Sequence, residues 1–320
     1  MRLELRHLEL VVAIADAGSL RRAAARLHLS QPAVTTQLKR IERFFGGSLF
    51  VRSADGVLPT HAGAELVRDA RNLLRQFEIL QRTARVNARS EAGAPVKVGG
   101  IPAQQFSLLV NALTALVPRR EVTSRTIRET GTLTALLRSG ELDVAVLREF
   151  PGFPLTLPDG VERRLLLREP IFVGVSEHHR FAGHKSVGLA ELAEEKWVMP
   201  DPDDSGMNEF FDRACAAAGF GQRITHFTTE AHVAFALVAG HRAICPLYPI
   251  GTARDGLATL ALTGTPLYRE LVLAWRTDSA LAALVDEVCA EIERGYLALV
   301  EGAPCYRRWW HDGGAAFALP

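Results

Sequence analysis

The feature that most restricts the fold of this chain is an amphipathic stretch near its start, SQPAVTTQLKRIERFFGG, over residues 30–47. Four apolar side chains in it follow one another at spacings of four, three and four, which places them on one face of an α-helix. They are Val34, Leu38, Ile41 and Phe45. We therefore predict a helix with this face buried.

A short alanine-rich stretch, SLRRAAARLH, and the turn LHLS precede this helix. Ala23 and Ala24 are small enough to let another helix approach closely. Ser30 is a favourable N-cap, and Pro32 falls in the first turn, where its missing N–H costs little. Helix, tight turn and helix in this order predict a helix-turn-helix motif.

The other face of the amphipathic helix carries hydroxyls and cations. In a helix-turn-helix the second helix enters the major groove of DNA with its N-terminal residues against base edges. Gln31 suits a bidentate pair with adenine, and Thr35 and Thr36 suit bases, thymine methyls or phosphates. Lys39 and Arg40 are long enough to reach guanine or the phosphate backbone. A plain solvent-exposed helix is the alternative.

Charge is distributed unevenly along the chain. Residues 1–90 contain 15 Lys and Arg against 8 Asp and Glu, a net charge of +7, and the remaining residues carry a net charge of −6. A basic N-terminal part on a mildly acidic body favours a polyanion as the partner of that part. An ordinary solvated surface would have the same composition.

The stretch GGSLFVRSADGVLPT follows the helix-turn-helix. Two short apolar runs flank its SADG turn, which predicts a small hairpin, or wing. Arg52 would stand at the base of this wing, within reach of the phosphate backbone. Pairing of Arg52 with a carboxylate is the alternative.

A long stretch without proline, residues 61–88, comes next. Apolar residues recur in it at spacings of four and three, which predicts a heptad seam on one long helix. The seam residues are Leu66, Ala70, Leu73, Phe77, Leu80 and Ala84. Such a seam can join two chains or pack on its own chain. Residues 89–94 lose the pattern and are predicted to form a hinge.

From residue 95 onward, apolar runs alternate with amphipathic stretches. VKVGG, ELDVAVL and YRELVLAWR are typical of strands, and TGTLTALLRSG and GMNEFFDRACAAAGF of helices. This alternation predicts an α/β body of parallel-rich sheets covered by helices, with a length that suits two small lobes.

The first 65 residues resemble the winged helix-turn-helix of LysR-type transcriptional regulators, through LRHLELVVAIADAGSLRRAAARLHLSQPAVTTQLKRIE, LFVR and THAG. Thr36 stands where that family often has arginine, and Pro59 where it often has leucine. The resemblance and the helix pattern together predict the DNA-binding residues Ser30, Gln31, Pro32, Ala33, Thr35, Thr36, Gln37, Lys39, Arg40 and Arg52. The same resemblance favours a dimer contact for the heptad seam.

The body resembles the same family through SGELDVAVL, the long stretch from LLLREPIFVGVS to EEKWVMP, and CAAAGF. The resemblance implies a fold like a periplasmic binding protein, with a ligand cleft between two lobes. The implied organisation is a DNA-binding domain at 1–60, a linker helix at 61–88, an effector-binding domain at 95–301 and a tail at 302–320. Lobe I would comprise 95–168 and 268–301, and lobe II 169–267.

Candidate effector residues lie where ligands of open α/β lobes bind, beyond the carboxyl ends of strands and at helix N-termini. Thr130 also matches an effector-site hydroxyl of the LysR family. The candidates are Gly100, Ile101, Gln104, Thr130, Ser205 and Gly206. Helix capping is the alternative role of Thr130 and Ser205. An unusual ligand, or none, is compatible with Pro102 and Gln104.

Other classes of function find little support in the sequence. GxSxG, Walker A and HExxH motifs do not occur, and GGIP is not a full dinucleotide-binding motif. Neighbouring His178, His179 and His184 rarely converge on one metal ion, so no metal and no cofactor are expected. Cys215 and Cys245 have apolar neighbours, which favours buried thiols over redox sensors. Without a signal peptide or an apolar segment of membrane length, the chain is expected to be cytoplasmic.

The function expected is that of a LysR-type transcriptional regulator controlled by a small-molecule effector. Its partners would be an operator in double-stranded DNA, a polar or singly anionic metabolite, a second copy of the chain in a dimer or tetramer, and the transcription machinery. A regulator whose body only oligomerises, or a solute-binding protein, is the alternative. In the tail, Trp309 and Trp310 would plug a subunit contact or belong to a loosely ordered end.

Overall fold

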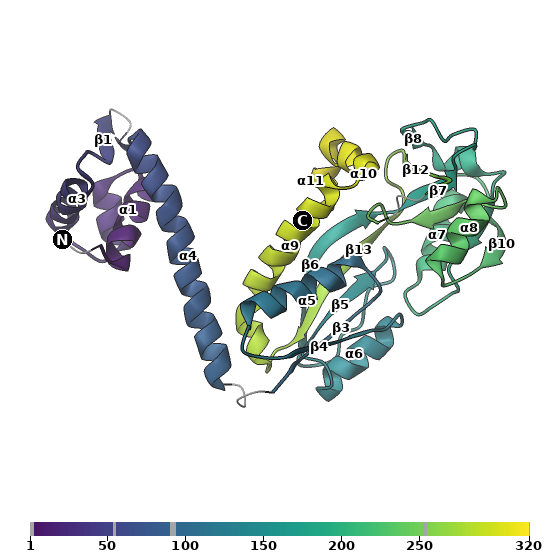
Figure 1. The fold of residues 1–320 in the computed structure, drawn as a ribbon, viewed down its shortest axis with the longest axis horizontal. Helices are drawn as coiled ribbons and strands as arrows, with labels where there is room; N and C mark the ends of the chain where they lie inside the picture. Colours follow the sequence, from purple (N-terminus) through teal and green to yellow (C-terminus); the bar gives the residue numbers. More distant parts are fainter. Residues whose placement is uncertain (1–2, 54–55, 90–93, 252–254, 320) are drawn as a thin grey trace. The chain divides into compact units, whose positions relative to one another are not determined.

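The computed structural model describes residues 3–53, 56–89, 94–251 and 255–319 (Figure 1). The chain divides into two compact units, Met1–Arg85 and Val86–Pro320. The first unit is helical with one hairpin, and the second is an α/β body. Each unit is described by itself.

The first unit is a winged helix-turn-helix. Its elements are α1 (Leu5–Ala17), α2 (Leu20–Arg26), α3 (Gln31–Phe45), the hairpin β1 (Phe50–Ser53) and β2 (Gly56–Pro59), and the start of α4 (His61–Arg89). Strand β1 pairs antiparallel with β2, so the predicted wing is confirmed. Glycine is required at Gly56, where φ is +127° and an added Cβ would lie 2.5 Å from the carbonyl oxygen of Gly18.

One apolar core joins the helices of this unit. Its members include Leu10, Val11, Ile14, Ala23, Val34, Leu38, Ile41, Leu49 and Val67. Three of the four residues predicted for the buried face of α3 are therefore in place. Phe45 is a correction, because it is 42% exposed at the end of the helix. The chain turns away at Gly46, which has a left-handed conformation, and Phe45 instead packs edge to face on Phe44.

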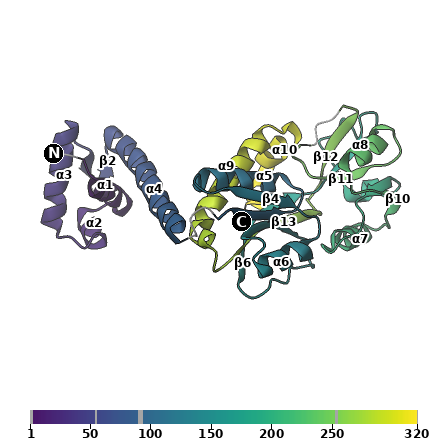
Figure 2. The same ribbon diagram turned by 60° about the horizontal axis from the view of Figure 1, so that its bottom comes forward.

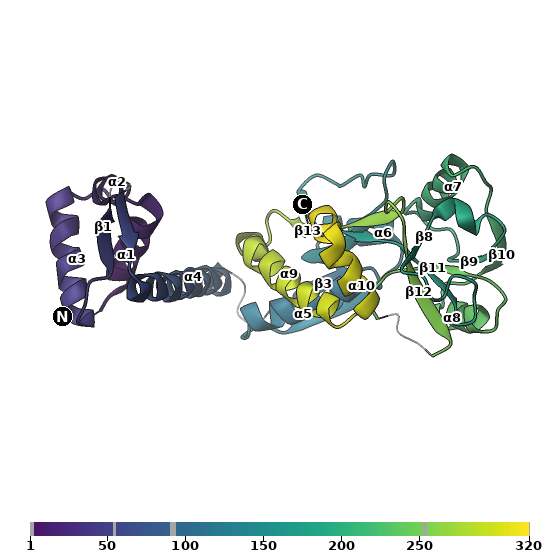
Figure 3. The same cartoon turned by 90° about the horizontal axis from the view of Figure 1, so that it is seen from above.

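The first lobe of the second unit is built on a five-stranded sheet with the order β4-β3-β5-β13-β6. The strands are β3 (Val96–Gly100), β4 (Val122–Thr126), β5 (Val144–Glu149), β6 (Val161–Pro170) and β13 (Tyr268–Arg276). Strands β3, β4 and β5 are parallel, whereas β13 runs antiparallel to β5 and β6. Helices α5 (Gln104–Leu116) and α9 (Val285–Glu301) lie side by side on one face, and α6 (Thr130–Ser139) lies on the other (Figures 1 and 3).

The second lobe has a four-stranded sheet with the order β11-β7-β12-β8 and a parallel pair, β9 and β10. Its strands are β7 (Phe172–Ser176), β8 (Ser186–Val187), β9 (Lys196–Met199), β10 (Arg223–Phe227), β11 (Cys245–Leu247) and β12 (Leu257–Leu262). Helices α7 (Met207–Ala217) and α8 (Ala231–Ala239) belong to this lobe (Figure 2). The 3-10 turn η1 (Leu189–Leu192) also belongs to it.

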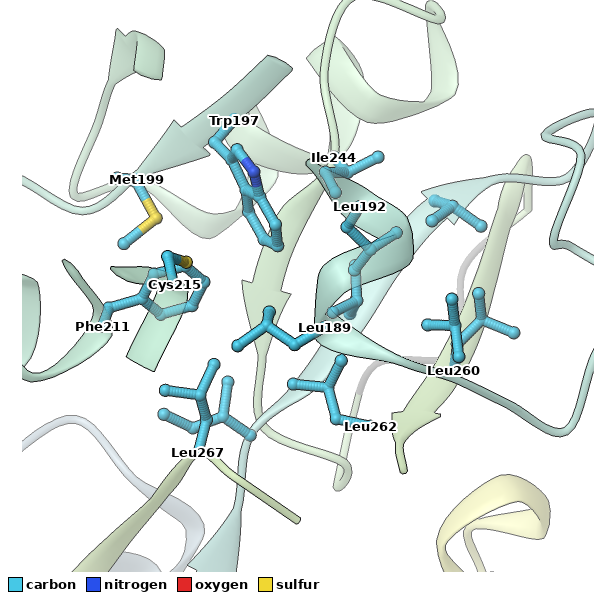
Figure 4. Packing of buried hydrophobic residues seen from close by; sticks show 14 of the residues in the cluster. Leu189, Leu192, Trp197, Met199, Phe211, Cys215, Ile244, Leu260, Leu262 and Leu267 are labelled. Atoms are coloured by element: carbon cyan, nitrogen blue, oxygen red, sulfur yellow. The ribbon is translucent and has the colours of Figure 1, made fainter. Parts of the chain in front are cut away.

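The core of the second lobe gathers side chains from its strands and helices. Trp197 and Phe211 meet edge to face at its centre, with 5.0 Å between ring centroids. Leu189, Leu192, Leu260, Leu262 and Leu267 close around them (Figure 4). The sequence patterns predicted β3, β5 and β13 and the helices α6 and α7, but not β8, η1 or β12.

The C-terminal segment is ordered, so of the two alternatives for the tail the loosely ordered end is wrong. It forms α10 (Pro304–Trp309), a π-helical turn η3 (Trp310–Gly314) and α11 (Ala315–Ala318), after η2 (Ala280–Leu284) and α9. Tyr306 is fully buried and Trp310 is 6% exposed. Trp310 packs on Tyr296 and Tyr306 of its own chain. An aromatic surface that could have joined subunits is therefore used inside the body.

Candidate DNA-binding and effector sites

The N-terminus of α3 is fixed by its own cap. The Oγ atom of Ser30 accepts a hydrogen bond from the backbone N–H of Ala33 at 3.3 Å, and Pro32 occupies the first turn. Thr35 donates its hydroxyl to the carbonyl oxygen of Gln31 at 3.0 Å. Because the hydrogen of this hydroxyl is already donated, its oxygen can only accept a hydrogen bond from DNA. Thr35 therefore suits a base amine better than a base carbonyl.

Polar side chains line the outer face of α3 toward solvent. Gln31, Thr36, Lys39 and Arg40 are exposed, and Gln37 is half-buried. Among the interactions of the described residues, Lys39 and Arg40 form no ion pair, so both charges face water. The side chain of Arg52 lies outside the described part of the chain.

Two carboxylates, Glu42 and Asp16, hold this unit in shape. Glu42 accepts a hydrogen bond from the backbone N–H of Leu49 at 3.0 Å, which ties α3 to the start of the wing. Asp16 pairs with Arg26 at 3.2 Å and with Arg71 at 2.5 Å, which ties α1 to α2 and α4. Glu42 belongs to the quoted LysR-like stretch, but nothing local marks Asp16, because its partner Arg71 is 55 residues away.

The heptad seam of α4 divides into two parts. Ala70 is buried at 1% exposure, and Leu66 packs on the core of the first unit. Leu73, Phe77 and Leu80 are exposed by 51%, 38% and 64%. The side chain of Ala84 lies outside the described residues. The start of the seam therefore packs against its own chain. The residues that follow form an exposed apolar stripe, Leu73–Phe77–Leu80.

A cavity of about 370 Å³ opens between the two lobes of the body. This volume is in the range of small-molecule sites. Apolar side chains form most of its wall, among them Val198, Met199, Met207, Phe235, Leu247, Tyr248 and Ile250. Three arginines also line it: Arg128, Arg148 and Arg269.

The six predicted effector residues lie near this cavity but do not line it. Gly100 and Ile101 are buried at the end of β3, and Gly206 is buried at the start of α7, where an added Cβ would lie 2.3 Å from the ring of Phe153. Ser205 is 4% exposed and donates its hydroxyl to Asp203. Gln104 is exposed, and its Nε2 would lie 3.3 Å from a Cβ added to Gly251, which does line the cavity.

Thr130 occupies an unexpected chemical position. It is the first residue of α6, whereas Glu129 is the N-cap, so Thr130 is not the capping residue. Its side chain is 1% exposed and its Oγ1 has no hydrogen-bond partner among the described residues. Its backbone N–H donates to Oδ1 of Asp204 at 3.0 Å, and that of Gly131 to Oδ2 at 2.6 Å. The helix terminus predicted for an effector thus holds a carboxylate of the second lobe.

A buried polar cluster lies behind the cavity. Glu169 accepts hydrogen bonds from Arg269, from Gln105 at 3.2 Å and from the hydroxyl of Tyr296 at 3.1 Å. The guanidinium of Arg269 also lies 3.2 Å from the ring centroid of Tyr248, a cation–π contact. Burial and the nearby Glu169 raise the pKa of Tyr296 well above its ordinary value, so it stays a neutral donor. No sequence pattern marked this cluster, because its members come from segments far apart in the chain.

Cys215 and Cys245 are poorly placed for redox chemistry. Cys215 is fully buried and Cys245 is 2% exposed. Burial raises the pKa of each thiol to about 12. The thiolate is the reactive form of cysteine, so burial disfavours reaction of both thiols at neutral pH. All four cysteines are free.

Two further observations bound the kind of site this chain contains. Within the described residues, no group of three or more His, Cys, Asp or Glu side chains is placed to hold a metal ion. None of the helices in the described part of the chain has both the length and the apolar character needed to cross a membrane.

Comparison with known proteins agrees with the two-unit organisation. Residues 5–64 match the family model described as a bacterial regulatory helix-turn-helix protein of the lysR family. Residues 89–296 match the LysR substrate binding domain. The chain belongs to the LysR family of transcriptional regulators. Members of this family are regulators and not enzymes.

Relatives of this LysR-type regulator span nearly its whole length. The small neutral protease regulatory protein of Streptomyces coelicolor is 36% identical over 318 residues, covering 98% of this chain and 93% of the relative. The dual regulator OxyR of Escherichia coli is 30% identical over 301 residues, covering 91% and 95%. The crystal structure of the LysR family regulator CbnR has the same fold, with 24% identity and a TM-score of 0.53 over 89% of this chain and all of CbnR.

These matches establish the function at the level of the family. The chain is a DNA-binding transcriptional regulator with a substrate-binding domain, and its expected partners are operator DNA, a small molecule and other copies of itself. They do not assign individual residues. The roles of α3, of the apolar stripe on α4 and of the inter-lobe cavity remain predictions.

Proposed function

We propose that this regulator reads its operator with α3, as a homo-oligomer joined through α4, and changes its binding when a small molecule occupies the inter-lobe cavity. The exposed polar face of α3 carries the proposal, because its cations have no partner among the described residues and its N-terminus is rigidly capped. Gln31, Thr35 and Thr36 would contact bases, and Lys39 and Arg40 the backbone. This function places the protein in the cytoplasm, and we assign it no catalytic step.

The DNA contacts are tested with Arg40→Ala in a salt titration. If Arg40 neutralises one phosphate, the variant should bind all sequences more weakly, and the slope of log K against log salt should fall by roughly one. Arg138→Ala removes an exposed arginine from α6 of the body and is the matched control. DNA upstream of a small neutral protease gene is the first probe, since the Streptomyces relative is named as a regulator of that enzyme. Equal slopes for the two variants would contradict a phosphate contact of Arg40.

The cavity supports an effector that is mostly apolar and carries a polar or singly anionic group. Arg269 is buried against Glu169, and Arg148 pairs with Asp203, so two of the three cavity arginines already have a carboxylate. Among the described residues, Arg128 forms no ion pair, and its guanidinium makes a single long hydrogen bond, 3.5 Å, to the carbonyl oxygen of Thr229. One ligand anion therefore suits the site better than several.

A thermal-shift screen of small metabolites against the full-length protein tests the effector role. A ligand of the folded state raises the melting temperature by mass action. For a ligand found in this way, Arg128→Ala should weaken binding by about tenfold, the value of one charge-assisted hydrogen bond. If no metabolite binds while operator binding is intact, the alternative function holds, in which the body only oligomerises.

A further inference from the structure

The two lobes of the body are joined by adjacent carboxylates of one loop. Asp203 and Asp204 precede α7 in lobe II, and both contact lobe I. Asp204 accepts the backbone N–H groups of Thr130 and Gly131, at 3.0 and 2.6 Å. Asp203 pairs with Arg148, whose Nη2 also donates to the carbonyl oxygen of Arg128 at 3.2 Å. Two neighbouring residues thus attach to two separate groups of lobe I.

The place that Asp204 occupies has the chemistry of an anion site. The first N–H groups of a helix have no partner within the helix, and the helix dipole favours negative charge there. Helix α6 has ten residues, and its N-cap Glu129 makes no side-chain capping bond. The acceptor comes instead from Asp204, 74 residues away in the chain. The bond therefore closes a contact between lobes and is not a local cap.

The surroundings are shaped to hold that carboxylate. Asp204 is exposed, and a Cβ on Gly131 would lie 3.0 Å from its Oδ2, so any larger residue at 131 would push the carboxylate back by a few tenths of an ångström. Asp203 is held in turn by Ser205, whose backbone N–H donates to its Oδ1 at 3.0 Å. Arg148 is 7% exposed, and its Nε has no hydrogen-bond partner among the described residues. A buried guanidinium that lost Asp203 would be left uncompensated at considerable cost.

We propose that the N-terminus of α6 is a carboxylate-binding site whose occupant is the chain's own Asp204. With Asp203 on Arg148, this internal carboxylate holds the lobes together without a ligand. A small carboxylate therefore does not bind at α6 in the natural protein, and an effector enters the neighbouring apolar cavity. Removal of the Asp204 side chain makes the same position a site for acetate. The inference rests on the proposed function only in assigning the cavity to an effector.

The test is amide hydrogen exchange of the full-length protein, followed in the peptide that contains Thr130 and Gly131. In Asp204→Gly these amides lose a charged acceptor and should exchange about tenfold faster. Acetate should restore their protection, and acetamide, which has the same shape without the charge, should not. In the natural protein acetate should change nothing. Glu209→Gln, which removes an exposed carboxylate from the first turn of α7, is the control and should exchange as the natural protein does.

Three results would overturn the proposal. The two amides could exchange at the same rate in Asp204→Gly as in the natural protein, acetate could slow their exchange in the natural protein as much as in the variant, or acetate could fail to slow it in the variant. If Asp204→Gly does not fold, Asp204→Asn keeps the shape and removes the charge, and it should still exchange faster at the same two amides. Operator binding is measured on the same samples. If the natural protein does not bind DNA, the proposed function is contradicted. The exchange result, and with it the proposal for Asp204, would still stand.

Discussion

Thr130 shows at the scale of a single residue how a structure changes an expected role. Its hydroxyl is buried and unpartnered among the described residues, a condition that costs about 1–3 kcal/mol. Thr130→Val keeps the shape and removes the hydroxyl, so we expect the free energy of unfolding to rise by about 1 kcal/mol and the melting temperature by about 2–4 °C. Calorimetry of the full-length protein measures both.

A matched control for that change is Thr134→Val in the same helix. The hydroxyl of Thr134 donates to the carbonyl oxygen of Gly131 at 2.9 Å, so its removal loses a bond and gains nothing. The effector interpretation of Thr130 predicts a different outcome, weaker ligand binding at unchanged stability. If Thr130→Val melts at a lower temperature than the natural protein, the hydroxyl of Thr130 has a partner.

The buried thiols give a prediction with a defined pH window. The pKa of Cys215 and of Cys245 is raised to about 12 by burial, whereas an unfolded thiol ionises near its ordinary pKa of about 8.5. A raised thiol pKa stabilises the folded state below the unfolded value, and this contribution is lost as the pH rises toward 12. We expect native Cys215 and Cys245 to resist thiol reagents and hydrogen peroxide at pH 8. Both should react fully after unfolding in guanidinium, and modification in the native protein, seen by mass spectrometry, would contradict their burial.

At the scale of elements, the apolar stripe Leu73–Phe77–Leu80 is the clearest unsatisfied surface of α4. We predict that Leu73→Asp with Phe77→Asp breaks the oligomer, because carboxylates buried without partners in a helix seam are costly. The body should stay folded, and operator binding should fall with the loss of the second half-site contact. Light scattering gives the mass, and circular dichroism the fold.

The control for that prediction lies beside the stripe. Asn72 is exposed on the same helix, so Asn72→Asp adds one carboxylate next to the position that Leu73→Asp changes. The Asn72→Asp protein should keep the oligomeric mass of the natural protein, and Leu73→Asp should shift it toward the monomer. If the double variant also keeps its mass, the oligomer is held together elsewhere.

Sequence periodicity predicted the elements better than it predicted what they contact. The spacing of four and three identified α3 and α4 correctly, but Phe45 and the start of the seam depend on where neighbouring helices lie. The buried residues of α10 and α11 belong to an aromatic cluster without regular spacing, so no periodic pattern predicted these two helices. The effector residues were expected at a helix N-terminus, and only the fold shows that Asp204 already occupies it.

At the scale of the whole molecule, the two units have separate apolar cores. Ile41 is fully buried in the first unit, and Leu260 is fully buried in the second lobe of the body. Large-to-small changes at such positions cost about 2–5 kcal/mol. Because a core change acts on the cooperative unit that contains it, we predict two calorimetric transitions. Ile41→Ala should lower only the one that DNA stabilises, and Leu260→Ala only the other. A single transition that moves with either substitution would show that the units unfold as one.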